Sequence, residues 1–137
     1  MRVILDTNVF VSGIFFAGPP YRILKAWRDG QLRLVVSQEI LDEYQRVGEE
    51  LAGRFPGVNP YSILDLVTVN AEIFLDQIMP EPVCQDPEDD KFIACAVASG
   101  CKVIVSGDKH LLDVSGFGGI IVMIPGKFIE KYLSMDS

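Results

Sequence analysis

Histidine and cysteine are scarce in this chain, which has one histidine and three cysteines among 137 residues. The odd number of cysteines and the lack of a CxxC pair argue against a disulfide framework and a zinc knuckle. With a single histidine, catalysis by a pair of histidines acting as acid and base is excluded as well. A reduced, cytoplasmic protein is therefore the first expectation.

Long apolar runs are also missing. No unbroken stretch approaches the roughly 20 residues that an apolar helix needs to span a bilayer. The first residues read as a strand, so we expect neither a membrane anchor nor a signal peptide. Hydrophobic residues make up 49% of the chain and charged residues 23%. This composition predicts one compact domain, residues 1–137, that is long enough to bury a core.

Positive charge is the third deficit, with 12 lysine and arginine residues against 19 aspartate and glutamate residues and a net charge of −7. A protein of this charge repels nucleic acid at long range, which argues against an unaided nucleic-acid binder. Acidity gathered in one metal-binding pocket would reverse that argument, because bound divalent cations attract phosphate. The net charge by itself therefore decides neither way.

Short apolar segments alternate along the chain with segments of helical periodicity. Strands are predicted over residues 2–5, 32–36, 102–106 and 120–124. Helices are predicted to begin at Pro19 and after an N-cap at Ser37, and to cover 61–77, 89–99 and 125–133, with a turn at 6–8. Connections of this length do not form hairpins. We therefore predict a mostly parallel central sheet with helices on both faces, a three-layer α/β/α fold.

Four acidic residues lie where apolar elements meet turns: Asp6, Glu43, Asp90 and Asp108. Asp6 and Asp108 each follow a predicted strand, and the carboxyl ends of parallel strands are where sites form in open α/β sheets. Helical spacing places Glu43 beside the buried stripe of its helix and Asp90 on the same face as Ile93. Buried carboxylates are costly unless a metal or a proton uses them. The four acids therefore predict a metal-binding pocket.

Each acid taken alone has an ordinary structural explanation. Asp6 and Asp108 would serve as turn or cap residues, and Glu43 as a solvated helix residue. The third acid is ambiguous, because Asp89 can also point inward. We favour Asp90 as the ligand and Asp89 as an N-cap or as a residue that supports the ligands. The conjunction of four acids at converging positions favours the pocket over four separate explanations.

Four segments of the sequence carry a more specific resemblance: VILDTNV at 3–9, SQEILDEY at 37–44, DPEDDKFI at 86–93 and VSGDKHLL at 105–112. In order and spacing they resemble the motifs of PIN-domain nucleases. More narrowly, the chain resembles the toxin components of prokaryotic toxin–antitoxin systems. The resemblance extends through IPGKFI at 124–129 and so covers essentially the whole chain.

This resemblance implies a divalent-metal-dependent endoribonuclease that uses Mg²⁺ or Mn²⁺. The implied ligands are Asp6, Glu43, Asp108 and one or both of Asp89 and Asp90. The implied catalytic residues are Asp6, Glu43, Asp90 and Asp108, supported by the polar residues Asn8 and Ser106. RNA is the implied substrate and a cognate antitoxin the implied partner, with a homodimer as a further expectation. His110 departs from the family pattern, and we expect it to be a surface residue without a role.

The chemistry of the residues agrees with this assignment. Hard carboxylate oxygens suit Mg²⁺ or Mn²⁺, whereas zinc would call for a His/Cys cluster. Phosphodiester hydrolysis then uses a metal-activated water that attacks in line. The cationic side chains that could face a nucleic-acid backbone are interpreted as ordinary surface charges; they are Arg22, Lys25, Lys91 and Lys109.

Other classes of protein fit less well. A receiver-like or phosphatase-like domain also has an aspartate after its first strand, but the phosphatase motif needs a second aspartate where this chain has Asn8. A nuclease that clamps duplex DNA would need helical insertions for which the chain is too short. A non-catalytic PIN-fold scaffold would be expected to have lost acids. This scaffold and a free-standing RNA-processing nuclease stay open as alternatives.

Overall fold

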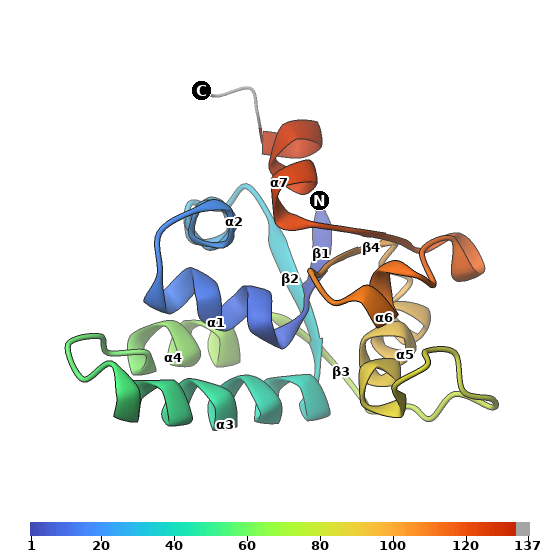
Figure 1. The fold of residues 1–137 in the computed structure, drawn as a ribbon, viewed down its shortest axis with the longest axis horizontal. Helices are drawn as coiled ribbons and strands as arrows, with labels where there is room; N and C mark the ends of the chain where they lie inside the picture. Colours follow the sequence, from blue (N-terminus) through green and yellow to red (C-terminus); the bar gives the residue numbers. More distant parts are fainter. Residues whose placement is uncertain (134–137) are drawn as a thin grey trace.

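A parallel five-stranded sheet forms the centre of the molecule. The computed structural model describes residues 1–133 (Figure 1), so 134–137 of the predicted domain lie outside the described residues. The strands are β1 (Arg2–Leu5), β2 (Arg33–Ser37), β3 (Glu72–Phe74), β4 (Val103–Val105) and β5 (Ile121–Met123). They lie in the order β3-β2-β1-β4-β5, and every adjacent pair is parallel.

Helices cover both faces of this sheet. They are α1 (Thr7–Phe15), α2 (Pro19–Arg28), α3 (Gln38–Arg54), α4 (Tyr61–Asn70), α5 (Asp90–Ser99), α6 (Lys109–Leu112) and α7 (Pro125–Phe128). Two single 3₁₀ turns, η1 (Pro87–Asp89) and η2 (Phe117–Gly119), and a π-helical segment, η3 (Ile129–Leu133), complete the set. Helices α1 to α4 lie on one side of the strands and α5 and α6 on the other (Figure 1). The predicted three-layer α/β/α fold is thus confirmed.

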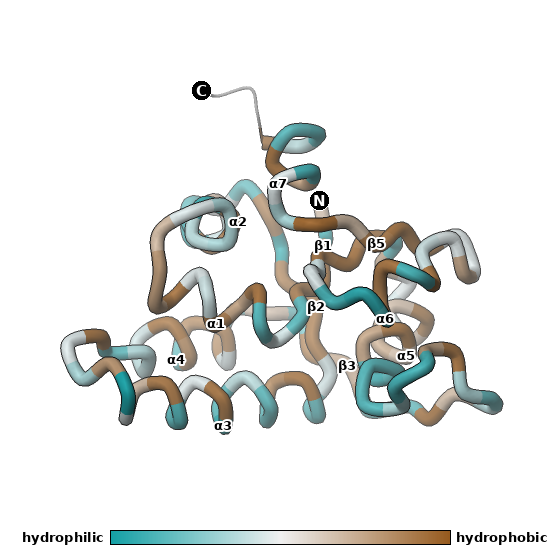
Figure 2. Tube along the Cα trace, viewed as in Figure 1, coloured by the Kyte–Doolittle hydropathy of each residue, from teal (hydrophilic) through white to brown (hydrophobic). Residues whose placement is uncertain are grey.

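The core lies between these layers and is made of strand and helix residues that are almost fully buried. Residues Val3 to Leu5 of β1 are each 0% exposed, and the tube is hydrophobic along the central strands (Figure 2). Phe10 of α1 stacks on Tyr44 of α3 with ring centroids 4.0 Å apart. The Tyr44 hydroxyl donates a hydrogen bond to the Leu5 carbonyl oxygen at 2.5 Å. These contacts fix α1 and α3 at the carboxyl end of β1.

The segment after β1 is helical, whereas the sequence predicted only a turn there. Helix α1 begins at Thr7 because Asp6 is its N-cap, with the Asp6 side chain accepting a hydrogen bond from the Asn8 main-chain N–H. Phe10 and its apolar neighbours then bury one face of α1. Asp6 therefore ends a strand and starts a helix within one residue.

The predicted helix over 61–77 is too long. Helix α4 ends at Asn70, and residues 72–74 form β3, which pairs in parallel with β2. The strand is held at the edge of the sheet by charge as well as by its ladder: Glu72 pairs with Arg2 at 3.2 Å and with Arg33 at 3.5 Å. Apolar periodicity alone did not separate this short strand from the helix before it.

Caps lie at the ends of two of the helices, and the one at Ser37 confirms its prediction. Ser37 caps α3, with its hydroxyl accepting a hydrogen bond from the Ile40 N–H at 3.2 Å. Gly100 ends α5 at φ +76°, a left-handed conformation that side chains other than glycine rarely adopt. Across residues 1–133, no helix has both the length and the apolar character required to cross a bilayer.

Candidate metal centre

Asp6 and Ser106 meet at the carboxyl ends of two paired strands. Because Leu5 pairs with Val105 across β1 and β4, the residues that follow are neighbours. The Ser106 hydroxyl donates to Asp6 Oδ2 at 2.6 Å, and both residues are buried. Burial raises the pKa of the Asp6 carboxyl, and the Ser106 hydrogen bond only partly opposes it. Ser106 therefore does orient an acid, as the sequence analysis expected of a supporting residue.

Asp108 is connected to Asp6 through the same serine. The Asp108 main-chain N–H donates to Ser106 Oγ at 2.9 Å. The Asp108 side chain caps α6 by accepting from the His110 N–H at 2.7 Å. The negative charge of Asp108 adds to the effect of burial in raising the pKa of Asp6. The two strand-following acids thus lie together, as parallel topology predicts.

Glu43 lies on α3 at the border of the buried face, with its side chain 19% exposed. Its Oε1 accepts a hydrogen bond from the Thr7 hydroxyl, and its Oε2 lies 2.9 Å from Lys91 Nζ and 3.6 Å from Arg46. Burial alone would raise the pKa of Glu43. The Thr7 and Lys91 hydrogen bonds and the nearby positive charges outweigh burial, and the pKa lies below its ordinary value.

Lys91 is the first correction to the sequence analysis, which interpreted it as a surface charge. Its side chain is only 5% exposed. The ammonium lies 2.9 Å from Glu43 and 3.5 Å from Glu88. Burial would lower the pKa of Lys91, but the pairing with Glu43 raises it. The sequence feature that could have indicated the burial of Lys91 is its position at the start of the apolar run 92–96. The other three cationic residues named above, Arg22, Lys25 and Lys109, are exposed as expected.

Asp89 and Asp90 make contacts that differ from those the sequence analysis favoured. Asp90, the favoured ligand, accepts hydrogen bonds from the main-chain N–H groups of Val83 and Cys84, the latter at 2.7 Å. Asp89, the expected cap, makes no capping hydrogen bond. Asp89 is 8% exposed, and its Oδ2 is buried without a hydrogen-bond partner among the described residues.

The raised pKa of Asp89 indicates a carboxylate that a bound cation would stabilise. Burial raises its pKa from the usual 3.8 to about 6, and three further acids raise it too, namely Asp108, Asp86 and Asp6. An unpartnered buried carboxylate is costly unless it takes up a proton or pairs with a cation. The structure therefore places Asp89 beside Asp6 and Asp108, while Asp90 holds a loop.

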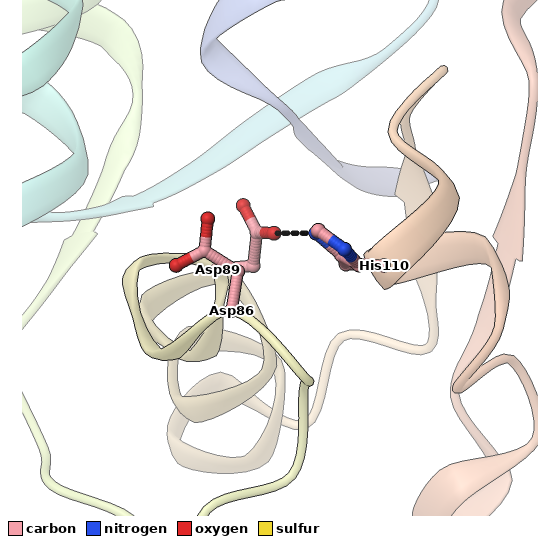
Figure 3. Close-up of side chains that lie close together, drawn as sticks. All are labelled: Asp86, Asp89 and His110. Atoms are coloured by element: carbon pink, nitrogen blue, oxygen red, sulfur yellow. Dashed lines mark ion pairs between the residues drawn. The ribbon is translucent and has the colours of Figure 1, made fainter.

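His110 lies at this acidic group rather than away from it. Its Nδ1 is 3.7 Å from Asp89 Oδ2 and 3.6 Å from Asp108 Oδ1, and the side chain is 39% exposed. One ligand atom each from Asp86, Asp89 and His110 lies within 4.8 Å of the others. Figure 3 shows the histidine on α6 facing the aspartates at the start of α5. The sequence analysis expected a surface residue without a role; the structure places the partly exposed His110 ring against Asp89 and Asp108.

Asn8 contributes less than the sequence analysis expected. It is exposed in the first turn of α1, and its main-chain N–H, rather than its side chain, donates to Asp6 Oδ1 at 3.4 Å. The geometry of a supporting polar side chain is therefore found for Ser106 and Thr7. Thr7 lay inside the N-terminal motif but was not singled out.

The donor set fits a hard or borderline divalent cation. The negative charges of Asp6 and Asp108 act on Asp89, and Asp89 Oδ2 is a buried acceptor without a hydrogen-bond partner among residues 1–133. Such oxygens are the ligands that Mg²⁺ and Mn²⁺ prefer. Burial and, to a smaller extent, repulsion between the acids raise the pKa values of Asp6 and Asp89, and a cation there would oppose both effects.

Comparison with known proteins agrees with this geometry. A family model described as "PIN domain" matches residues 2–110. The chain is also similar to MJ1680, an uncharacterized protein of Methanocaldococcus jannaschii, with 28% identity over 145 aligned residues that cover 96% of this chain and 92% of that protein. PIN domains are generally metal-dependent nucleases, and the acidic cluster expected of such an enzyme is present here. The chain belongs to the PIN-domain family.

Proposed function

We propose that this protein is a divalent-metal-dependent endoribonuclease and the toxin of a toxin–antitoxin pair. The observation that carries the nuclease is the buried, unpartnered Asp89 Oδ2 beside Asp6 and Asp108 in a chain of the PIN family. Such a carboxylate destabilises the native protein unless a cation occupies the pocket. A buried carboxylate that lowers stability in this way is typical of a functional site.

The chain's own residues would fix the geometry of the reaction. Ser106 holds Asp6 by its hydroxyl and Asp108 by the same oxygen, so the two acids keep one spacing. Thr7 and Lys91 hold the two oxygens of Glu43. Preorganised ligands of this kind lower the cost of ordering a site when substrate arrives.

The cation would be held by Asp6, Asp89 and Asp108, with Glu43 at the border of the pocket. When bound, a divalent ion supplies an activated water and offsets the charge that builds up on the phosphate. The acids alone would repel a phosphodiester, because the protein carries a net charge of −7. We therefore expect RNA binding to depend on the metal.

The central experiment is RNA cleavage by the purified chain in Mg²⁺ or Mn²⁺, with a chelator as control. Asp6→Asn should lower cleavage by roughly 1,000-fold or more, because the ion loses a charged ligand that Ser106 orients. The matched control is Asp65→Asn, an exposed aspartate on α4, which should cleave like the wild type. Wild-type rates in the Asp6 variant would refute the assignment.

The toxin role rests on the motif resemblance and needs its own test. Expression of the chain should arrest growth of a bacterial host, and coexpression of a small protein encoded beside it should restore growth. The Asp6→Asn variant should not arrest growth. Arrest without any neighbouring partner, together with processing of one RNA class, would favour a free-standing RNA-processing nuclease instead.

A second candidate, a non-catalytic PIN-fold scaffold, is favoured by one observation. The Glu43 carboxylate is already neutralised by Lys91 and approached by Arg46, so part of the acidic pocket is filled by the protein itself. Under this hypothesis Mg²⁺ and Mn²⁺ would leave the melting temperature unchanged at millimolar concentration. A metal-dependent rise follows instead if a cation binds the native state only.

A further inference from the structure

We propose that the His110 imidazole is a ligand of the metal centre and makes this centre favour ions that accept nitrogen, such as Mn²⁺ and Co²⁺, over Mg²⁺. The inference rests on the proposed metal centre but not on the identity of the RNA. Its starting point is the placement of Nδ1 between two carboxylates. Nδ1 lies 3.7 Å from Asp89 Oδ2 (Figure 3) and 3.6 Å from Asp108 Oδ1.

The position of the imidazole is built by the fold. The His110 main-chain N–H is held by the Asp108 carboxylate at 2.7 Å, so the first turn of α6 carries the ring toward the acids. Asp89 reaches the same point from the turn before α5. Two elements that are distant in sequence thus present a nitrogen and an oxygen to each other.

The distances fit a shared cation better than a hydrogen bond. Both exceed the 2.7 to 3.2 Å of an ordinary N–H···O bond. Two ligands that each lie about 2.1 Å from one ion are separated by about 3 Å at right angles and about 4 Å when opposite. The separations of Nδ1 from the two carboxylate oxygens lie between these limits.

The unpartnered oxygen of Asp89 is a second, independent observation. Asp89 is 8% exposed, and Oδ2, the atom that faces His110, has no hydrogen-bond partner among residues 1–133. A simple imidazole–carboxylate hydrogen bond would have satisfied it. Asp86 brings a further carboxylate oxygen within 4.8 Å of the other two ligand atoms. The group therefore combines a nitrogen donor with a buried oxygen that lacks a partner.

Ligand chemistry gives this arrangement a consequence for metal choice. Mg²⁺ takes oxygen ligands and keeps several waters, whereas imidazole suits later first-row ions. A nitrogen ligand therefore adds affinity for Co²⁺ and Mn²⁺ and little for Mg²⁺. Without His110 the centre would have oxygen ligands alone, and its affinities for Co²⁺, Mn²⁺ and Mg²⁺ would differ less.

The experiment measures metal binding to the full chain by calorimetry, with Co²⁺, Mn²⁺ and Mg²⁺ each titrated alone. His110→Ala should lower Co²⁺ affinity by roughly tenfold or more and Mg²⁺ affinity by less than about threefold, because only the former gains from a nitrogen ligand. The matched control is Lys109→Ala, an exposed neighbour on α6, which should alter all three affinities equally or not at all. Equal losses for Co²⁺ and Mg²⁺ in the His110 variant would overturn the inference.

Since His110 is the one histidine of the chain, any histidine ring signals in a proton NMR spectrum belong to this residue. Saturating Co²⁺ should move them outside the diamagnetic range, and Zn²⁺ should shift them without broadening. Unmoved signals at saturating Zn²⁺ would mean that the histidine only pairs with the carboxylates, and the inference would fail.

The two proposals fail separately. RNA cleavage in Mg²⁺ combined with metal binding that is independent of His110 would overturn the ligand role and leave the nuclease intact. Binding of Co²⁺ through His110 without any cleavage of RNA would overturn the nuclease and support the ligand role.

Discussion

The acidic pocket has two halves that solve the same electrostatic problem differently. In one half, Glu43 is paired with the buried ammonium of Lys91, and its pKa is lowered. In the other half, Asp6 and Asp89 are buried without a cationic partner of comparable burial, and their pKa values are raised. We call the first the paired half, because its charges are balanced by groups of the protein itself, and the second the unpaired half, because it lacks a positive charge.

This difference indicates where an external cation would bind. A divalent ion gains most where like charges repel and oxygens lack partners, which is the half around Asp89. The lysine in the other half occupies the place that a second ion would need beside Glu43. We therefore expect one tightly held ion in the wild-type chain. The following predictions test this comparison, beginning with the largest expected effect.

Substitution of the two adjacent aspartates should separate the halves most strongly. Asp89→Asn should lower metal-dependent RNA cleavage by roughly 100-fold or more, because a charged ligand is removed from the unpaired half. Asp90→Asn should keep cleavage within about tenfold and lower the free energy of unfolding by about 1 kcal/mol, because it weakens the hydrogen bonds to the Val83 and Cys84 N–H groups. Single-turnover cleavage and urea unfolding measure the two effects.

The reverse ranking of the two variants would return the ligand to Asp90, as the sequence analysis had it. Equal and negligible effects on cleavage would remove the third acid from the site altogether. Either result would break the division of the pocket into a paired half and an unpaired half.

The parts of this site that the sequence predicted are those that topology determines. Asp6 and Asp108 lie near each other because each follows a strand of one parallel pair. Ser106 follows the same strand as Asp108 and therefore contacts Asp6. The preference for Asp90 over Asp89 rested on helical phase, whereas Asp89 lies in the 3₁₀ turn η1 that precedes α5. A 3₁₀ turn advances about 120° per residue instead of 100°, so helical phase counted back from Ile93 fails at Asp89.

Two further residues were missed because their roles depend on partners far away in sequence. Lys91 looks like a surface lysine until α3 brings Glu43 against it, 48 residues earlier in the chain. His110 looks solvated until η1 brings Asp89 to it. Strand β3 was missed for a related reason, since its pairing with β2 is not visible in local periodicity.

Removal of the internal cation should have the next largest effect. Lys91→Met leaves Glu43 with the Thr7 hydroxyl and with Arg46, a cation whose side chain is 62% exposed. It should lower the free energy of unfolding of the metal-free protein by about 2 kcal/mol. This is less than the loss for a fully buried pair, because Glu43 is partly solvated. Mn²⁺ should recover part of the loss, since the Glu43 oxygens become available to a cation. Urea unfolding with chelator and with Mn²⁺ measures both.

The matched control is Lys25→Met on α2, which removes an exposed pair with Asp29 at 3.1 Å. Exposed pairs contribute little, so this variant should lose no more than about 0.5 kcal/mol and gain no extra response to metal. If the Lys91 variant behaved like the Lys25 variant, the paired half would contribute nothing particular to the pocket.

The smallest effect is the pH dependence of the metal-free protein, and it reports on the unpaired half alone. The pKa of Asp89 is raised from 3.8 to about 6 in the native state, so the native protein binds more protons than the unfolded chain between these values. The free energy of unfolding should therefore fall as pH rises from about 4.5 to 7, by on the order of 1 kcal/mol. The lowered pKa of Glu43 makes the free energy of unfolding rise with pH, but only below about pH 4.5.

Urea unfolding of chelator-treated protein measures how the free energy of unfolding changes with pH. Asp89→Asn should flatten this dependence, which separates the Asp89 carboxyl from the titratable groups that face it, namely Asp6, Asp86, Asp108 and His110. Saturating Mn²⁺ should cancel the fall, because the ion stabilises the ionised carboxylate that the metal-free pocket disfavours. A slope that is the same in the wild type and the Asp89 variant would show that this carboxylate is not the unsatisfied charge of the pocket.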